Sequence, residues 1–327
     1  MSKNSLTLVF ACGRYDRTEP LRTGDVAVDG INLKYVPIDA PRELFDRVAC
    51  GEFDLSELSA SEFISMAGRG DSAFVALPVF PSRVFRHGFI FINKRAGIRS
   101  PKDLEGKRIG VPLYTQTAAI WIRGHLAHEY GVNLETIRWV QGAVEKPGSH
   151  GSPQVPPLLQ RVRIEVNETG SSLGELLACG EIDALIGSRR PETLGQHSDV
   201  ARLFPNYREI EREFYQRTGI FPIMHLVVIR RAVHERNPWI ATNLYRAFVE
   251  AKDFALARMR FSGSQAYMLP WQFADVEEID EVFGGDPWPY GTEANRPTLE
   301  ALIGYMIEQH FIAQPMPAEQ LFLPVDR

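Results

Sequence analysis

Short apolar runs alternate with amphipathic stretches over most of the chain. Each run is flanked by Gly, Pro, Ser or Asn, and its length suits a buried strand more than a helix. Strands that alternate with helices predict an α/β fold built on parallel sheets. The runs expected to form strands are residues 6–11, 33–38, 74–77, 89–92, 108–111, 184–186 and 223–229.

Helix boundaries are marked between these runs. Pro41 fits the first turn of a helix that ends before Gly51, and the polar residues 112–117 open a helix that Gly131 closes after Tyr130. Residues 171–180 form another capped helix. A long helix is expected from a cap at Asn237 to about residue 260.

The length of 327 residues exceeds the usual size of one domain and predicts two. The simplest assembly places residues 1–90 and 225–327 in domain I and residues 91–224 in domain II, joined by crossings near residues 89–93 and 220–229. This is the two-domain, type II architecture of periplasmic binding proteins, with a ligand cleft between domains that close about a hinge. Ligands bind at the carboxyl ends of the strands in such sheets. That rule selects the loops at residues 13–17, 57–61, 112–117 and 187–191.

Composition narrows the kind of ligand. The chain is 44% hydrophobic and 24% charged, as in ordinary globular proteins, and its net charge of −5 argues against a nucleic-acid partner. Arginines nevertheless cluster locally, which favours a small anionic ligand. No apolar stretch approaches the ~20 residues that span a membrane. The run at residues 6–11 is shorter than the core of an export signal, so we expect a buried strand there and a cytoplasmic protein.

The three cysteines, Cys12, Cys50 and Cys179, are too widely spaced for a metal pattern or a disulfide framework. Cys50 and Cys179 each precede a glycine at an expected helix end, where we expect buried free thiols.

An aromatic-rich segment at residues 77–93 contains Arg83, Arg86 and His87. Folding does not require such a cluster of cations, whereas an anionic ligand does. The alternative for both arginines is salt bridging between the domains. Arg14 and Arg17, in the first cleft loop beside Tyr15, are candidates for a substrate carboxylate or for plain surface charge.

Two histidines are candidates for moving a proton near neutral pH. His87 is a general acid or a structural hinge residue, and His225, within an apolar strand, is a general acid or a core histidine bonded to a carbonyl. Glu57 serves either as a base or as the partner of an arginine. A metal site made by these three side chains has no supporting local spacing, so no metal is expected.

Polar groups at two further loops complete the candidate site. Thr115, Gln116 and Thr117 stand at a helix N-terminus, where they bind a ligand or simply cap the helix. Arg189 follows the strand at residues 184–186 and is placed to reach the cleft or to remain on the surface.

Several strings resemble those of the 4,5-dihydroxyphthalate decarboxylase family, over about residues 6 to 324. The two most specific are Pro78-Val-Phe-Pro-Ser-Arg-Val-Phe-Arg-His87 and Trp288-Pro-Tyr-Gly291. The others are Tyr15-Asp-Arg-Thr18, Asp54-Leu-Ser-Glu-Leu58, Thr117-Ala-Ala-Ile-Trp-Ile-Arg-Gly124, Gly180-Glu-Ile-Asp-Ala-Leu185, Pro222-Ile-Met-His225 and Asn295-Arg-Pro-Thr-Leu299.

The resemblance implies loss of CO2 from 4,5-dihydroxyphthalate, or a close hydroxylated aromatic dicarboxylate, to give 3,4-dihydroxybenzoate without a cofactor. It adds Tyr15, Tyr290, Asn295 and Arg296 to the substrate-binding candidates, although the residues around Trp288 also suit simple packing. The leading alternative is a solute-binding protein that delivers an aromatic or sulfonated anion to a membrane transporter. A pyrimidine-synthesis enzyme of similar fold is a third. A homo-oligomer is possible through the Trp-rich C-terminal region.

Overall fold

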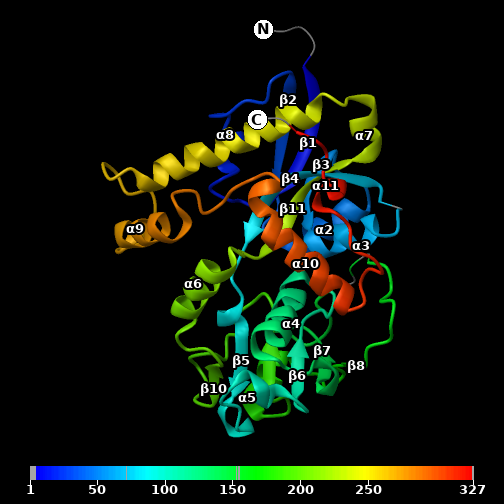
Figure 1. Cartoon of the computed structure of the whole chain (residues 1–327), viewed down its shortest axis with the longest axis vertical. Helices are drawn as coiled ribbons and strands as arrows, with labels where there is room; N and C mark the ends of the chain where they lie inside the picture. Colours follow the sequence, from blue (N-terminus) through cyan, green and yellow to red (C-terminus); the bar gives the residue numbers. More distant parts are fainter. Residues whose placement is uncertain (1–4, 71, 152, 154, 326–327) are drawn as a thin grey trace.

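The computed structural model describes residues 5–70, 72–151, 153 and 155–325, and it contains two β-sheets stacked end to end (Figure 1). A five-stranded sheet in the upper half has the order β2-β1-β3-β11-β4, and a six-stranded sheet in the lower half has the order β10-β5-β9-β6-β7-β8. The predicted two-domain α/β fold of the type II class is confirmed.

The upper sheet is made of β1 (Leu6–Cys12), β2 (Ile31–Pro37), β3 (Leu55–Ser59), β4 (Phe74–Arg83) and β11 (Ile223–Arg230). The lower sheet is made of β5 (Ile90–Asn93), β6 (Arg108–Val111), β7 (Arg138–Gln141), β8 (Ile164–Val166), β9 (Ala184–Ile186) and β10 (Val200–Arg202). Both sheets are mixed, which differs from the expected parallel arrangement. β11 runs antiparallel to β3 and β4, because it is the strand by which the chain returns from the lower half.

Four of the longer helices lie close to the boundaries expected from the sequence: α2 (Pro41–Ala49), α4 (Thr117–Tyr130), α5 (Leu173–Cys179) and α8 (Ile240–Arg260). No boundaries were predicted for the other four, α3 (Ala60–Ala67), α6 (Tyr207–Thr218), α9 (Gln272–Phe283) and α10 (Arg296–Glu308). Shorter helices are α1 (Glu19–Thr23), α7 (Arg231–Arg236) and α11 (Ala318–Leu321).

Three local expectations are wrong. Asn237 lies between α7 and α8 and does not cap the long helix, because α7 already forms on its N-terminal side. Glu57 lies inside strand β3 and not in a loop. Cys50 and Cys179 are exposed, since each stands at the C-terminal end of a surface helix, and only Cys12 among the free thiols is buried.

Helix α4 ties the two halves together. Its Trp121 donates from Nε1 to the carbonyl of Ile223 on β11 at 2.9 Å, and its Arg123 donates from Nε to Oε1 of Gln309 at 2.7 Å. Gly124 lies against Tyr305 of α10, and a Cβ at this glycine would stand 2.1 Å from the tyrosine ring. The absence of a side chain at Gly124 therefore sets how closely α4 and α10 approach.

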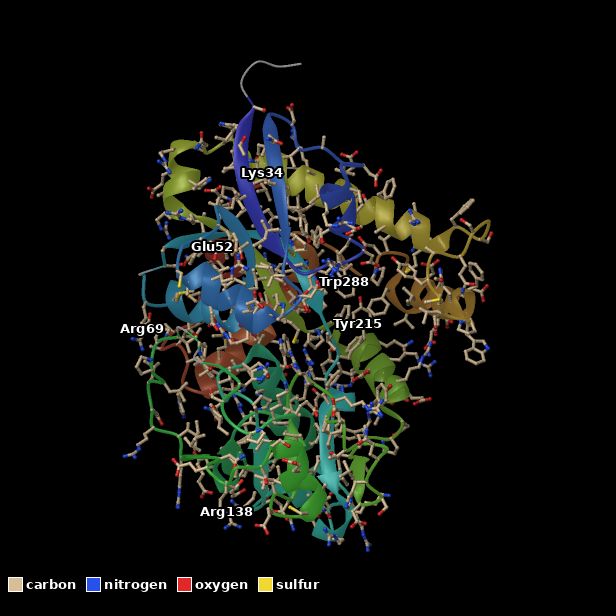
Figure 2. All side chains as sticks on the ribbon, turned by 180° about the vertical axis from the view of Figure 1, so that it is seen from behind. Lys34, Glu52, Arg69, Arg138, Tyr215 and Trp288 are labelled. Atoms are coloured by element: carbon tan, nitrogen blue, oxygen red, sulfur yellow. The ribbon has the colours of Figure 1, made fainter. Side chains whose placement is uncertain are left out.

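Helix α8 crosses the upper half of the molecule, and α9 lies beyond its end, where the two project to one side (Figure 1). Trp288 and Tyr215 lie close together near the middle of the molecule (Figure 2). Trp288 packs edge-on against Phe221 at 5.2 Å, and Tyr215 lies 4.3 Å from Phe283 of α9, measured between ring centroids. These aromatic contacts thus connect the upper half of the molecule to the lower half.

None of the helices in the described part of the chain combines the length and the apolar character needed to cross a membrane. The upper sheet takes its strands from residues 6–83 and 223–230, and the lower sheet from residues 90–202. The division at residues 1–90 plus 225–327 and 91–224 stays a proposal.

Candidate active site

A cavity of about 250 Å³ lies where the two halves meet. The upper half supplies the C-terminal end of β3, the C-terminal part of β4 and the start of β11. The lower half supplies the β6–α4 loop and the residues that follow β9. The volume lies just below the range of about 300–1,000 Å³ that is typical of drug-sized ligands, so the cavity suits a small molecule.

A carboxylate–histidine pair stands at one wall. His225 lines the cavity, and its Nδ1 lies 2.5 Å from Oε1 of Glu57, which is only 1% exposed behind it. Strands β3 and β11 are antiparallel neighbours, with Glu57 opposite Val227, so both side chains come from adjoining strands. The rigid sheet holds the two groups in register.

Three further donors hold the Glu57 carboxylate. Tyr15 donates from Oη to Oε1 at 2.7 Å, the backbone N–H of Gly13 donates to Oε2 at 2.9 Å, and Cys12 donates from Sγ to Oε2 at 3.3 Å. A Cβ at Gly13 would lie 3.0 Å from the Tyr15 ring, so glycine lets that ring lie over the loop.

These bonds determine the charge of Glu57. Burial opposes ionisation, but the hydrogen bonds and charge of His225, with the donors at Gly13 and Tyr15, outweigh it and lower the pKa of Glu57 to about 2. An ionised carboxylate only accepts hydrogen bonds, so Nδ1 of His225 carries the hydrogen. Nε2 makes no hydrogen bond with the described residues, and in the neutral ring it has a free lone pair.

Arg86 supplies an unpaired cation at the same cavity. It is 4% exposed, its Nε contacts Sδ of Met224 at 3.2 Å, and its buried Nη1 has no hydrogen-bond partner among the described residues. Burial lowers the pKa of Arg86 to about 9, which leaves it charged at neutral pH. Its guanidinium carbon lies 4.8 Å from the centroid of the Phe89 ring, and the charge of Glu211 partly offsets the effect of burial on the pKa of Arg86. A buried cation that forms no salt bridge with a described residue is costly, so this position favours an anionic ligand.

The N-terminus of α4 forms the opposite wall. Thr115, Gln116, Thr117 and Ala118 line the cavity, and the first N–H groups of a helix have no partner within it. Gln116 donates from Nε2 to Oγ of Ser188 at 2.9 Å, while its buried Oε1 has no partner among the described residues. That oxygen is available to accept a hydrogen bond from a ligand hydroxyl.

Thr117 also joins the halves beside the cavity. Its Oγ1 lies 3.0 Å from Oγ of Ser59 and 2.9 Å from Oγ of Ser61, and it accepts from the backbone N–H of Ser61 at 3.1 Å. These bonds fix the start of α4 against the end of β3.

Sequence reasoning missed two residues of α2, Arg42 and Phe45, and one of α3, Glu62, that line the cavity. Arg42 donates from Nη1 to Oε1 of Glu62 at 2.8 Å and from Nε to Oδ1 of Asp46 at 3.0 Å. Phe45 packs edge-on against the His225 ring at 5.0 Å. The only sequence signal for the two residues of α2 was the helix start at Pro41, which brings the first turn of α2 to the sheet edge.

Arg189 and His150 also line the cavity. Burial, followed by the charges of Arg189 and Arg42, lowers the pKa of His150. Arg189 is an exposed residue of the cavity lining, and its role in binding a ligand stays a prediction.

His87 lies outside the cavity lining. It is 2% exposed, stacks on His125 at 5.0 Å and contacts Phe214 at 5.3 Å between ring centroids. Burial, with a contribution from Arg217, lowers the pKa of His87 to about 4, so the ring is neutral at pH 7. His87 thus packs within an aromatic cluster and does not line the cavity.

Arg83, Tyr290 and Asn295 form a separate buried group. Arg83 donates from Nη2 to the carbonyl of Pro289 at 2.9 Å and to Oδ1 of Asn295. Asn295 donates from Nδ2 to the carbonyls of Pro289 and Gly291. Tyr290 is buried, and burial raises its pKa. This group shapes the loop after α9 and does not line the cavity.

The remaining candidates lie on other surfaces. Arg14 is exposed and pairs with Asp39, and Arg296 is paired with Glu293 and Glu319 outside the cavity. Arg17 stacks between Tyr15 and Trp288, at 4.5 and 4.1 Å from their ring centroids. Arg17 also donates from Nε to the carbonyl of Pro81 at 2.7 Å, and it does not line the cavity.

No group of three or more His, Cys, Asp or Glu side chains within the described residues is arranged to hold a metal ion.

The fold is shared with solved binding proteins. The periplasmic aliphatic sulphonate binding protein of Escherichia coli superposes with a TM-score of 0.53 at 12% identity, covering 97% of this chain and 92% of that one. The alkanesulfonate-binding protein of Xanthomonas axonopodis pv. citri bound to MOPS superposes with a TM-score of 0.51 at 10% identity, covering 99% and 100%. The chain thus has the periplasmic-binding-protein fold, with a cavity between its two halves.

Two curated relatives identify the family among proteins of this fold. A 4,5-dihydroxyphthalate decarboxylase of Comamonas testosteroni is 36% identical over 326 residues, covering 99% of this chain and 98% of the relative. A 4,5-dihydroxyphthalate decarboxylase of Pseudomonas putida is 38% identical over 215 residues, covering 65% and 83%. No protein-family model matches the chain. The chain belongs to the 4,5-dihydroxyphthalate decarboxylase family, and the resemblance found in the sequence is confirmed.

Proposed function

We propose that this protein is a carboxy-lyase that converts 4,5-dihydroxyphthalate, or a closely related hydroxylated aromatic dicarboxylate, to 3,4-dihydroxybenzoate and CO2. The proposal rests on the family together with one observation, the Glu57–His225 pair at the wall of a cavity that also contains a buried, unpaired arginine.

Such a substrate has carboxylates and ring hydroxyls. The cavity contains cations that suit the carboxylates and hydrogen-bond acceptors that suit the hydroxyls. Arg86 and the N-terminus of α4 bind carboxylate oxygens, and Arg189 adds positive charge. Nε2 of His225 and Oε1 of Gln116 accept hydrogen bonds from ring hydroxyls.

The chemistry requires a place for the electrons of the breaking bond. The hydroxyl para to the departing carboxylate loses its proton while the carbon bearing that carboxylate gains one, which gives a keto-like intermediate. CO2 then leaves and its bonding electrons restore the aromatic ring. One base and one acid suffice, and no organic cofactor enters the reaction.

His225 is the base in this proposal. Glu57 keeps the hydrogen of the neutral ring on Nδ1, so Nε2 is free to take the hydroxyl proton. Glu57 acts through His225 as a positioning residue, and Tyr15 orients Glu57.

Incubation with a panel of hydroxylated phthalates, followed by measurement of CO2 and identification of the product, tests the proposal. We expect turnover of 4,5-dihydroxyphthalate to 3,4-dihydroxybenzoate. Tight binding of these compounds without CO2 release would instead favour a solute-binding protein.

A cytoplasmic location, a two-domain division at the boundaries given above and assembly into a homo-oligomer belong to the same proposal. Fractionation of cells and light scattering of the purified protein test the first and the third.

A further inference from the structure

Glu62 has an unusual environment for a carboxyl group. It lies in the first turn of α3, is 7% exposed and lines the cavity together with His225. Its Oε1 accepts from Nη1 of Arg42 at 2.8 Å, and its Oε2 makes no hydrogen bond with the described residues. No structural bond therefore uses the second oxygen.

Glu57 and Glu62 differ in their hydrogen bonding. Glu57 receives bonds from Cys12, Gly13, Tyr15 and His225, whereas Glu62 receives one from Arg42. The pKa of Glu57 is low, but burial raises the pKa of Glu62 above its ordinary value and outweighs the charge of Arg42. Two carboxyl groups whose environments shift their pKa values in opposite directions are typical of a site that separates acid and base roles.

We propose that Glu62 is a second catalytic residue, the acid that protonates the ring carbon from which CO2 departs. The inference rests on the proposed function, since it names the group that supplies the proton in that reaction. The Glu57–His225 pair leaves this role open, because a histidine that takes the hydroxyl proton at Nε2 is not also the donor to the ring carbon.

The hydroxyl proton passes to Nε2 of His225, the O–H electrons form a C=O bond, and a ring electron pair takes the proton of Glu62 to form a C–H bond. The C–CO2 bond then breaks and its electrons rebuild the aromatic ring, while the oxygen takes its proton back from His225. Solvent reprotonates Glu62, so one solvent proton is consumed for each CO2 released.

The substitution Glu62→Gln removes the acid but keeps an oxygen for Arg42. We expect kcat for CO2 release to fall at least ~100-fold with little change in KM. A second readout follows the product: in D2O, the same acid exchanges a ring hydrogen of 3,4-dihydroxybenzoate for deuterium, which proton NMR detects without any loss of CO2. We expect Glu62→Gln to lose this exchange to the same extent.

The control variant is Asp46→Asn, which removes the other carboxylate partner of Arg42 at a residue that does not line the cavity. It should keep both rates close to those of the wild type, and a loss as large as in Glu62→Gln would show that Glu62 acts only by pairing Arg42. Glu62→Asp retains a carboxylic acid and should exchange deuterium faster than Glu62→Gln, with thermal unfolding confirming that each variant is folded.

The results separate the two proposals. If the wild type releases no CO2 from the phthalate panel, the proposed function fails and the role of Glu62 fails with it. If the wild type is active and Glu62→Gln keeps either CO2 release or exchange, the role of Glu62 alone is overturned. Equal exchange in the Asp and Gln variants would also overturn it.

Discussion

His225 and His87 show two different uses of an imidazole in one apolar environment. His225 makes an ionic hydrogen bond behind the cavity wall, whereas His87 packs among rings. Replacement His225→Asn keeps a donor near the position of Nδ1 and removes Nε2. We expect it to lower turnover at least ~100-fold, as measured by CO2 release.

The matched comparison is His87→Ala, which should lower the free energy of unfolding by about 2–4 kcal/mol by leaving a hole among aromatic rings. Turnover per folded molecule should stay close to that of the wild type. A large loss of turnover in folded His87→Ala would return that histidine to the list of catalytic candidates.

The second prediction concerns Arg86. Arg86→Lys keeps the charge but loses the planar set of donors, so KM for the dicarboxylate should rise about tenfold or more while kcat changes less. Steady-state kinetics measure this. Arg83→Lys, outside the cavity, should destabilise the fold through loss of its bonds to Pro289 and Asn295 and leave KM unchanged.

The third prediction follows from the ionisation of Glu57. Its folded-state pKa of about 2 lies below the ordinary value of 4.5, so its contribution to stability is complete above pH 4.5 and declines as the pH falls from 4.5 towards 2. In urea unfolding at a series of pH values, Glu57→Gln should therefore be less stable than the wild type near neutral pH, and this difference should narrow below pH 4.5. A constant difference over that range would contradict the assignment.

Helices α4 and α10 provide a test among the secondary-structure elements. Gly124→Ala forces a methyl group into the Tyr305 ring and should cost about 1–3 kcal/mol of unfolding free energy. Gly304→Ala, in α10 with no atom within 4 Å of the added carbon, should instead stabilise the fold by about 0.5–1 kcal/mol. Denaturant unfolding measures both, and the opposite signs make each variant a control for the other.

The sequence predicts a secondary-structure element well where a residue next to it in the chain marks its end. Gly131 and Gly180 end α4 and α5 as expected, both in the left-handed conformation that favours glycine. The strands β3, β7, β8 and β10 were missed, because runs as short as Ile164–Val166 acquire their conformation from pairing with neighbours and not from their own pattern.

The residues of the candidate site were likewise predictable only where a local sequence signal marks them. Gln116 and Thr117 are predictable because a polar loop that opens a helix has a defined place at the sheet edge. Glu62 follows no such rule, since a glutamate in the first turn of a helix ordinarily faces solvent, and its burial beside Arg42 of α2 comes from tertiary packing. Arg83 was a candidate for binding an anionic ligand, but it donates a hydrogen bond to Asn295, which is 212 residues away in the sequence. A contact between residues so far apart cannot be predicted from the local sequence pattern.

For the molecule as a whole, the buried contacts of α4 with β11 and α10 predict cooperative unfolding of the two halves. We expect one thermal transition, with the same midpoint by far-ultraviolet circular dichroism and by tryptophan fluorescence, because neither half keeps its core when Trp121 and Arg123 lose their partners. Two separated midpoints would show that the halves unfold independently.

The positions of the free thiols have a practical consequence. Cys50 ends α2 in the upper half and Cys179 ends α5 in the lower half, both exposed, while Cys12 is buried and its pKa is raised by burial and by Glu57. A maleimide spin label added to the unmodified protein would therefore attach at one point on each half. Pulsed electron resonance would then measure the distance between the two labels with and without an aromatic dicarboxylate. A change in that distance would show that the halves move.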